Sequence, residues 1–209
     1  MATNLPNEPR IYLASRSPRR QELLRQIGVG FHELRLREAP GRDPDIVEGP
    51  RDGESAPDYV KRIARTKAHV GWERMTERGL PPRPVLGADT EVVLDGHIFG
   101  KPADSPHAME MLARLAGRTH VVMTAVALRW EREFVILVST SQVTMRELAD
   151  NEMARYVATG EPVGKAGAYA IQGRAAAFIT RIDGSYSGVM GLPLAETAAA
   201  LARIGLAVL

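Results

Sequence analysis

The chain has 209 residues, of which 44% are hydrophobic and 25% charged, with 27 basic against 25 acidic side chains. This composition is ordinary for a globular protein and supplies enough apolar material for one large domain or two joined lobes. The absence of cysteine excludes disulfides, thiolate metal sites and a cysteine nucleophile. A net charge of +2 with no basic run, and only 5% aromatic residues, lacks the pattern of a nucleic-acid binder, so we expect no nucleic-acid partner.

The start of the chain has neither a basic segment nor the apolar segment of a secretory signal. No apolar run approaches the ~20 residues that a membrane-spanning helix needs. The sequence therefore predicts no membrane partner, and it favours a cytoplasmic location.

The first predicted elements are a strand over residues 11–14 and a helix over 18–27. Ser17 suits the N-cap of that helix, and the proline after it suits the first helical position. A second strand is expected over 31–36. The stretch 37–53 contains three prolines and three glycines, so we expect a loop there.

Two arginines in the first turn of this helix break a local rule. Arg19 and Arg20 oppose the positive end of the helix dipole, at a cost of roughly 0.3–1 kcal/mol each when exposed. A local rule broken without an evident packing gain indicates a functional site. The free amides of the turn, the hydroxyl of Ser15 and the two guanidinium groups together predict a phosphate-binding pocket.

Lys67 lies on the apolar face of the next predicted helix, which begins after Ser55 and extends to about residue 73. It shares that face with apolar side chains three, four and seven positions before it. A lysine in this position either extends its ammonium group out of the core edge or points it into a cleft. The spacing alone leaves both alternatives open.

A short apolar strand over 84–88 ends at Asp89, and a hairpin is expected over 91–99. Open α/β sheets place ligand-binding groups at the carboxyl ends of strands. Asp89 could therefore hold a hydrated divalent cation or orient a water molecule, or it could simply begin a turn. Lys101 follows the hairpin, where it could contact a phosphate or remain a solvated loop lysine.

The remaining predicted elements alternate between helices and strands. They are a helix over 105–117, antiparallel strands over 119–128 and 134–145, a helix over 150–157, strands over 168–172 and 176–182, and a helix over 193–204. Hairpins combined with helical crossovers predict the α/β class, with a mixed, twisted sheet and helices on both faces. The guanidinium groups, lysines, carboxylate and hydroxyls suit phosphoryl chemistry, in which charge neutralisation and positioning dominate.

At these residues the chain resembles the Maf family of nucleoside triphosphate pyrophosphatases. The resemblance covers nearly the whole chain in ordered blocks, namely residues 13–24, 87–90, 100–102, 117–120, 165–173, 184–187 and 191–197. It implies that residues 1–209 form one Maf-like domain, with two lobes flanking a nucleotide-binding cleft as in ITPase-like proteins. Blocks 165–173 and 184–187 resemble the branch of the family that acts on dTTP and UTP.

The resemblance implies hydrolysis between the α and β phosphates, which yields a nucleoside monophosphate and pyrophosphate. Asp89 matches the proton acceptor of the family. The positions tied to substrate choice are Arg19, Thr90 and Gln172. The positions that hold the triphosphate are Ser15, Arg20, Lys67 and Lys101.

A divalent metal cation, Mg²⁺ or Mn²⁺, is the cofactor that the resemblance implies. The family often carries an acidic segment of the form Asp-Ile-Asp-Glu before the helix that contains Lys67, and the matching stretch here is residues 45–48. Here Val47 replaces one acidic residue of that segment, so the metal ligands are expected to be Glu48 and Asp89. Because the family often forms dimers, a homodimer is the assembly that the resemblance implies.

Two alternative functions belong to different classes. One is a pyrophosphatase of the same fold that acts on 7-methyl-GTP or on a broader set of modified nucleotides. The other is a non-catalytic regulator of cell division, or a nucleic-acid binder, with a vestigial nucleotide site. Asp89 argues against the second, because a protein that only binds nucleotides does not need a proton acceptor.

Overall fold

The computed structural model describes residues 10–36, 46 and 48–208. Two compact units divide the chain. The first unit comprises Met1–Asp89, Ala125–Val138 and Gly191–Leu209, and the second comprises Thr90–Thr124 and Ser139–Met190. That residues 1–209 form a single domain with a cleft between its lobes remains a prediction.

The sheet is mixed, as the sequence predicted. In the described part of the chain its strand order is β2-β1-β3-β5-β6-β7, with β4 paired to β3. Strand β1 pairs in parallel with both β2 and β3, whereas the β3–β4 and β6–β7 pairs are antiparallel. The strands that contribute residues to both units are β3 (Val85–Leu94), β5 (Thr119–Trp130) and β6 (Glu133–Met145).

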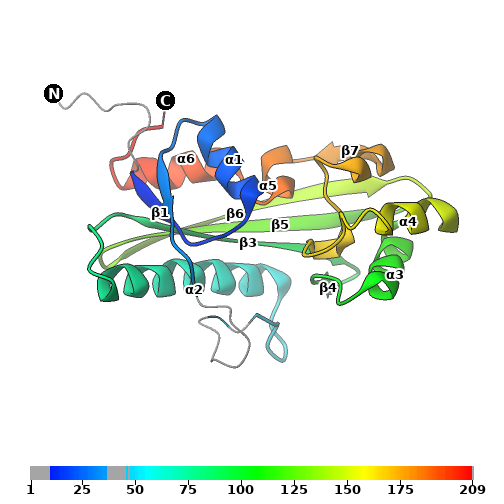
Figure 1. Ribbon diagram of the computed structural model, residues 1–209, viewed down its shortest axis with the longest axis horizontal. Coiled ribbons are helices and arrows are strands. Elements are labelled where there is room, and N and C mark those ends of the chain that lie inside the picture. The colour runs from blue at the N-terminus through cyan, green and yellow to red at the C-terminus, as the bar shows by residue number, and fades with distance from the viewer. Residues whose placement is uncertain (1–9, 37–45, 47, 209) are drawn as a thin grey trace. The chain divides into compact units, whose positions relative to one another are not determined.

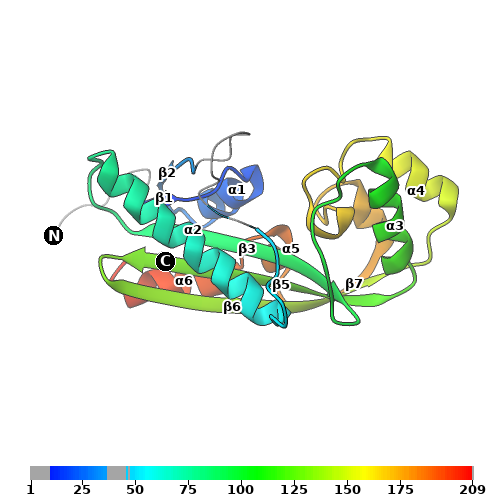
Figure 2. The same cartoon turned by 90° about the horizontal axis from the view of Figure 1, so that it is seen from below.

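In the first unit, helices cover both faces of the strands, as predicted (Figures 1 and 2). Helices α1 and α6 lie on one face and α2 lies on the other. A core cluster that includes Tyr12, Leu34, Met75 and Val85 joins α2 to the strands, and Trp72 of α2 packs against this cluster. The other elements of this unit are β1 (Ile11–Leu13), α1 (Pro18–Gln26), β2 (Phe31–Glu33), α2 (Ala56–Glu77) and α6 (Leu194–Arg203).

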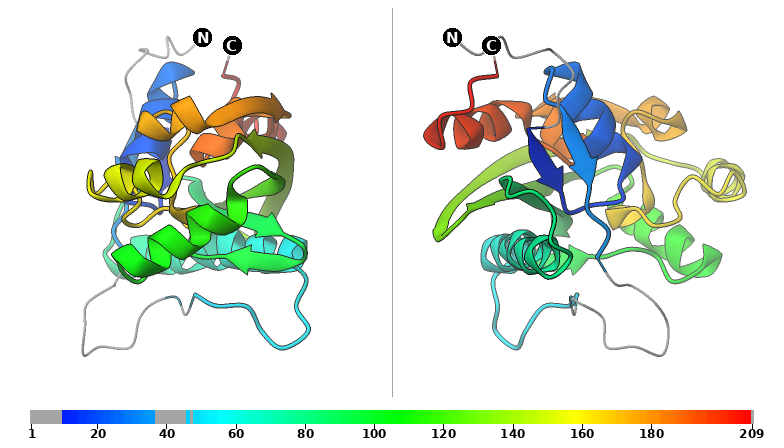
Figure 3. Two further views of the ribbon diagram at one scale, coloured as in Figure 1. Left: turned by 90° about the vertical axis from the view of Figure 1, so that its right-hand side faces the viewer. Right: turned by 60° about the vertical axis from the view of Figure 1, so that its left-hand side comes forward.

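The second unit contains the shorter helices. Helix α3 packs against α4 and against the single turn η1. The left panel of Figure 3 shows α3 in green and α4 in yellow. The elements of this unit are β4 (His97–Phe99), α3 (Ser105–Leu115), α4 (Asp150–Val157), η1 (Ala166–Ala168), η2 (Arg174–Phe178), β7 (Ile179–Asp183) and α5 (Tyr186–Met190).

Helix α2 lies very close to strand β3, because glycines stand where the two elements meet. A Cβ atom at Gly87 would lie 2.5 Å from the carbonyl oxygen of Ala64 and 2.6 Å from the amide nitrogen of Ala68. A Cβ atom at Gly71 of α2 would lie 2.7 Å from the side chain of Val85. Only glycine permits so close an approach of two backbones. The contact at Gly87 brings residue 67 of α2 directly beside β3.

Three expectations about strands were wrong. Residues 168–172 form no strand, because Gly167 and Ala168 adopt left-handed φ angles of 68° and 59° and end the extended run. The predicted strand over 176–182 begins only at Ile179, after the short helix η2. Strand β3 does not end before Asp89 but continues through it to Leu94.

Candidate active site

The turn between β1 and α1 has the predicted backbone, but its capping differs from the expectation. Ser17 occupies the N-cap position, yet its side chain makes no capping hydrogen bond. The hydroxyl oxygen of Ser15 instead accepts from the backbone amide of Ser17 at 3.2 Å. The same oxygen accepts from Nη1 of Arg20, also at 3.2 Å. The structure thus brings Ser15 and Arg20 into direct contact.

Arg19 and Arg20, in the first turn of α1, are partly buried rather than fully solvated. Nε of Arg20 donates to the carbonyl oxygen of Gly191 at 2.8 Å, which ties the start of α1 to the segment before α6. Burial lowers the pKa of Arg19 from its ordinary value. A guanidinium held in place in this way loses little further side-chain entropy when it binds an anion. The contacts of Arg20 also offset the unfavourable position of its charge at the start of the helix.

Lys67 points its ammonium group inward, onto two carboxylates. Its Nζ lies 2.7 Å from Oδ1 of Asp89 and 2.8 Å from Oε1 of Glu48. The side chain is only 13% exposed, so the alternative in which it extends into solvent is wrong. One ammonium group therefore joins the two residues that were predicted as metal ligands.

Asp89 lies inside β3 and its side chain is 9% exposed. The pairing of β1 with β3 ends at Leu13 and Leu86, so Asp89 lies just beyond the carboxyl end of the parallel strand β1. This is the edge of a parallel sheet at which ligand-binding groups gather. One carboxylate oxygen, Oδ1, accepts from Lys67. The other, Oδ2, is buried and makes no hydrogen bond to any described residue.

Glu48 lies in a segment that Arg62 holds against α2. Nε and Nη2 of Arg62 lie 2.6 and 2.7 Å from the two carboxylate oxygens of Glu54. Nη2 also donates to the carbonyl oxygen of Gly49 at 2.8 Å, next to Glu48. Arg62 could not be predicted as a site residue from the sequence, because its partners come from a loop whose path no local pattern fixes. Val47, the predicted departure from the family, lies outside the described residues.

The site suits a divalent cation in its donor chemistry. Magnesium and manganese ions bind through one or two carboxylates, with water and phosphate oxygens completing the shell. Oδ2 of Asp89 has no hydrogen-bond partner among the described residues, and the side chain of Glu48 is 41% exposed. No cluster of three or more acidic, histidine or cysteine ligands occurs among the described residues. The donor chemistry of the two carboxylates on Lys67 fits such an ion, and their role as its ligands remains a prediction.

The other three predicted residues, Thr90, Lys101 and Gln172, belong to the second unit. The hydroxyl oxygen of Thr90, on β3, lies 3.0 Å from that of Thr124. Lys101 follows β4 and is exposed, and the carbonyl oxygen of its neighbour Gly100 accepts from the amide of Gly167 at 3.1 Å. Gln172 is exposed in the turn that precedes η2.

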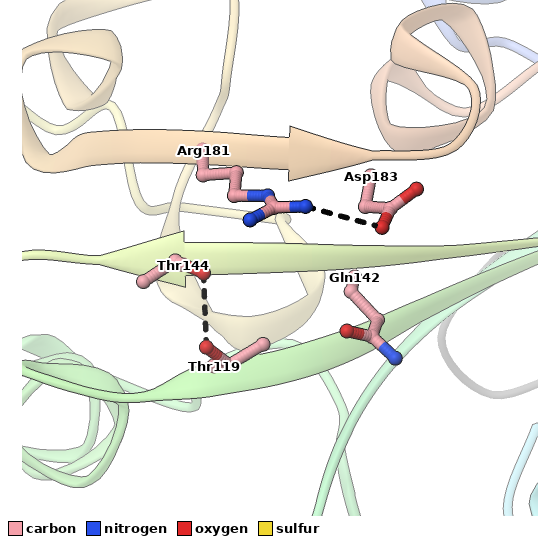
Figure 4. A pocket seen from close by; sticks show the side chains of 5 residues that line it. All are labelled: Thr119, Gln142, Thr144, Arg181 and Asp183. Atoms are coloured by element: carbon pink, nitrogen blue, oxygen red, sulfur yellow. Dashed lines mark hydrogen bonds and ion pairs between the residues drawn. The ribbon is translucent and has the colours of Figure 1, made fainter.

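A separate hollow of about 180 Å³ lies on strands β5, β6 and β7 of the second unit (Figure 4). An exposed ion pair of 3.6 Å between Arg181 and Asp183 lies at its rim. Thr119 and Thr144 face each other across it, with 2.9 Å between their hydroxyl oxygens. Exposed pairs of this kind contribute little to binding or stability. The hollow shares no residue with the predicted site.

Taken together, the fold and these side chains define an α/β protein in which two partly buried arginines begin α1 and one lysine of α2 pairs with two carboxylates. A sequence model described as "Maf-like protein" matches residues 10–204. The chain belongs to the Maf family. In the described part of the chain, no helix has the length and apolar character that crossing a bilayer requires.

Curated relatives align with nearly the full chain. A protein of Nitrosospira multiformis named dTTP/UTP pyrophosphatase is 59% identical over 91% of this chain and 92% of its own. Proteins of the same name from Nitrosomonas europaea and Aromatoleum aromaticum are 54% and 55% identical, over 95% and 96% of this chain and 96% and 98% of their own. The solved Ham1 protein of Staphylococcus aureus aligns over 67% of this chain and 72% of its own, at 17% identity with a TM-score of 0.43, which supports no inference.

Proposed function

We propose that this chain hydrolyses dTTP and UTP to the nucleoside monophosphate and pyrophosphate. The observation that carries the proposal is the identity of 54–59%, over more than nine-tenths of both chains, to relatives named for that activity. The side chains of the first unit agree with the proposal, because they combine anion-binding groups with a buried carboxylate.

In this proposal, cationic groups bind the triphosphate. Arg20, fixed by Ser15 and by a backbone carbonyl, presents its guanidinium at the start of α1. Arg19 and Lys67 add two further positive charges in the first unit, and Lys101 adds one in the second. Phosphoryl transfer depends mainly on such positioning and charge neutralisation, so these groups bind the substrate and stabilise the transition state.

Asp89 is the proposed proton acceptor. A water oxygen attacks the α phosphorus, and the bond between that phosphorus and the oxygen bridging to the β phosphate breaks. Pyrophosphate leaves with the electron pair of that bond, and Asp89 takes the proton of the attacking water. Oδ2 suits this role because it is buried, lies beside the ion pair of Oδ1 with Lys67, and accepts no hydrogen bond from a described residue.

Glu48 and Asp89 are the proposed ligands of Mg²⁺ or Mn²⁺. When bound, such an ion neutralises charge on phosphate oxygens and orients them for attack. Lys67 contacts both carboxylates and so holds them close together.

Gln172 is the proposed reader of the base, with Thr90 and Arg19 as further determinants of substrate choice. The side-chain amide of Gln172 offers one acceptor and one donor group. Uracil and thymine present a donor beside an acceptor on one edge. The side chain makes no hydrogen bond to the described residues, so both groups remain available to a ligand.

The proposal extends to location and assembly. A cytoplasmic location follows from the substrate, since nucleoside triphosphates are made and used there. A homodimer is proposed from the family resemblance, and sedimentation at micromolar concentration tests it.

The deciding experiment measures turnover of dTTP, UTP, CTP and 7-methyl-GTP, with the products identified. We expect monophosphate and pyrophosphate from dTTP and UTP, and a loss of at least about 100-fold in kcat for Asp89→Asn. Asp52→Asn is the matched control, because Asp52 is exposed in the same unit. Release of inorganic phosphate, or wild-type turnover by Asp89→Asn, would contradict the proposal.

A further inference from the structure

Gln172 lies in a short segment whose flanking residues are all fixed. Its neighbour Ile171 is 4% exposed, and Tyr169 and Ala175 are 6% and 0% exposed, whereas Gln172 itself is exposed. The segment belongs to the second unit, as do all of the residues that hold it. Gln172 therefore contributes its side chain to the surface, while the residues just before it, Tyr169, Ala170 and Ile171, are buried.

Glu161 holds the segment on the carboxyl side of Gln172. Its Oε2 accepts from the amide of Arg174 at 2.9 Å, and its Oε1 accepts from the amide of Ala175 at 3.3 Å. These amides begin the short helix η2, so the carboxylate caps the helix from a distant part of the chain. A Cβ atom at Gly173 would lie 2.4 Å from Oε1 of Glu161, which shows how closely the carboxylate lies against the turn.

Tyr156 holds the segment on the amino side of Gln172 and is joined to Glu161. Its hydroxyl donates to Oε1 of Glu161 at 3.0 Å and accepts from the amide of Ala170 at 3.3 Å. Burial raises the pKa of Tyr156, so the hydroxyl stays protonated and continues to donate. The ring also contacts Phe178 of η2, edge to face. One connected pair, Tyr156 and Glu161, therefore binds the backbone on both sides of Gln172.

Tyr169, the residue before Ala170, provides a second contact that holds the segment. The hydroxyl of Tyr169 lies 2.8 Å from Nε2 of His120, and both side chains are buried. Before it, Ala168 has a φ of 59°, a conformation that costs an alanine roughly 1 kcal/mol. Such strain persists only where the surrounding contacts over-determine the backbone. The contacts therefore hold the backbone of this turn in one conformation.

We propose that Glu161 and Tyr156 are positioning residues for Gln172, and that through it they set the preference for thymine and uracil over cytosine. The inference rests on the proposed function, in which Gln172 reads the base. An amide distinguishes two base edges only when it is held to within about 0.5 Å of the productive geometry. Glu161 and Tyr156 supply that restraint through the backbone on either side, and neither touches the substrate.

The test compares kcat/KM for dTTP with kcat/KM for CTP in Gln172→Ala, Glu161→Ala, Tyr156→Phe and the double variant of Glu161 and Gln172. Glu110→Ala is the matched control, because Glu110 is an exposed carboxylate of the same unit. Tyr156→Phe removes only one oxygen atom from a buried ring, so we expect this variant to fold. It therefore tests the inference even if Glu161→Ala does not fold. Melting temperatures are recorded for every variant.

We expect Gln172→Ala to lower the dTTP/CTP ratio by about tenfold, and Glu161→Ala and Tyr156→Phe to lower it by about three- to tenfold. Glu161→Ala and Tyr156→Phe should each raise KM for dTTP and leave kcat near its wild-type value. The double variant should match Gln172→Ala, because a residue that acts through Gln172 has no effect once that side chain is gone.

The outcomes separate the two proposals. If Gln172→Ala lowers the ratio while both positioning variants keep it at the wild-type value, only the positioning inference is overturned. A double variant that falls well below Gln172→Ala also overturns the positioning inference alone, because Glu161 would then act by another route. An unchanged ratio in Gln172→Ala overturns the base-reading role, and the positioning inference with it.

Discussion

Gly87→Ala perturbs the candidate site without altering any of its functional groups. The new methyl group would lie 2.5 Å from the carbonyl oxygen of Ala64 and 2.6 Å from the amide nitrogen of Ala68, both of them backbone atoms of α2. Ordinary contact begins near 3.4 Å, so helix and strand must separate by about 1 Å. Lys67 lies on that stretch of helix, and its 2.7 Å contact with Asp89 must lengthen or its side chain must re-orient.

Overpacking of this kind costs about 1–3 kcal/mol. For a chain of this size, each kcal/mol lowers the melting temperature by roughly 2–4 °C, so we expect a decrease of about 2–12 °C. A shift of about 1 Å at catalytic groups costs about 100-fold in rate, so kcat for dTTP should fall far more than the stability change explains. The assay is calorimetry together with pyrophosphate release from dTTP.

Gly100→Ala is the matched control, since a Cβ atom there meets nothing within 4 Å. We expect it to melt within about 2 °C of the wild type, because a surface substitution away from special features changes stability by less than about 0.5 kcal/mol. A Gly87→Ala protein with wild-type melting temperature and wild-type kcat would refute the reasoning. It would mean that the separation of α2 from β3 does not control the Lys67–Asp89 pair.

Three further predictions concern charged and titratable groups. Lys67→Met removes the cation from Asp89, so we expect urea titration to show a loss of about 1–3 kcal/mol in unfolding free energy and turnover to fall at least about 100-fold. Glu48→Gln should raise the Mg²⁺ concentration for half-maximal turnover about tenfold, with chelation abolishing activity, whereas an unchanged requirement would exclude Glu48 as a ligand. Burial lowers the pKa of His120 to about 4, so between pH 6.5 and 4 the unfolded state binds more protons and stability falls with acidification, by about 3 kcal/mol from this group. His120→Asn should flatten that part of a pH series of urea titrations, and an unchanged slope would contradict the assignment.

Features that depend on adjacent residues could be predicted from the sequence. Helix α2 has its N-cap at Ser55, whose oxygen accepts from the amide of Asp58, because capping is decided within one turn. The hairpin turn forms at Asp95 and Gly96, both with left-handed φ angles, as that residue pair favours. Pro18 begins α1 for the same kind of local reason.

Features that depend on distant residues could not be predicted in this way. The residues Lys67, Glu48 and Asp89 could each be named from the sequence, but their joint ion pairing depends on how α2 packs against β3. That packing is set by Gly87, whose lack of a side chain has no local signature of function. The apolar run over 168–172 has the composition of a strand, but the left-handed backbone at Ala168 overrides that propensity.

The two strongest conflicts with local rules fall in the segments that we connect with the substrate. The first turn of α1 carries two cations at the positive end of its dipole, and Arg20 is held there by Ser15 and a backbone carbonyl. The turn before Gln172 contains a buried alanine, Ala168, in a left-handed conformation, and the two residues after it are held by His120 and Tyr156. Each arrangement carries a local free-energy cost of roughly 1 kcal/mol. These costs are explained if the side chains that they position bind the substrate, Arg20 through the phosphates and Gln172 through the base.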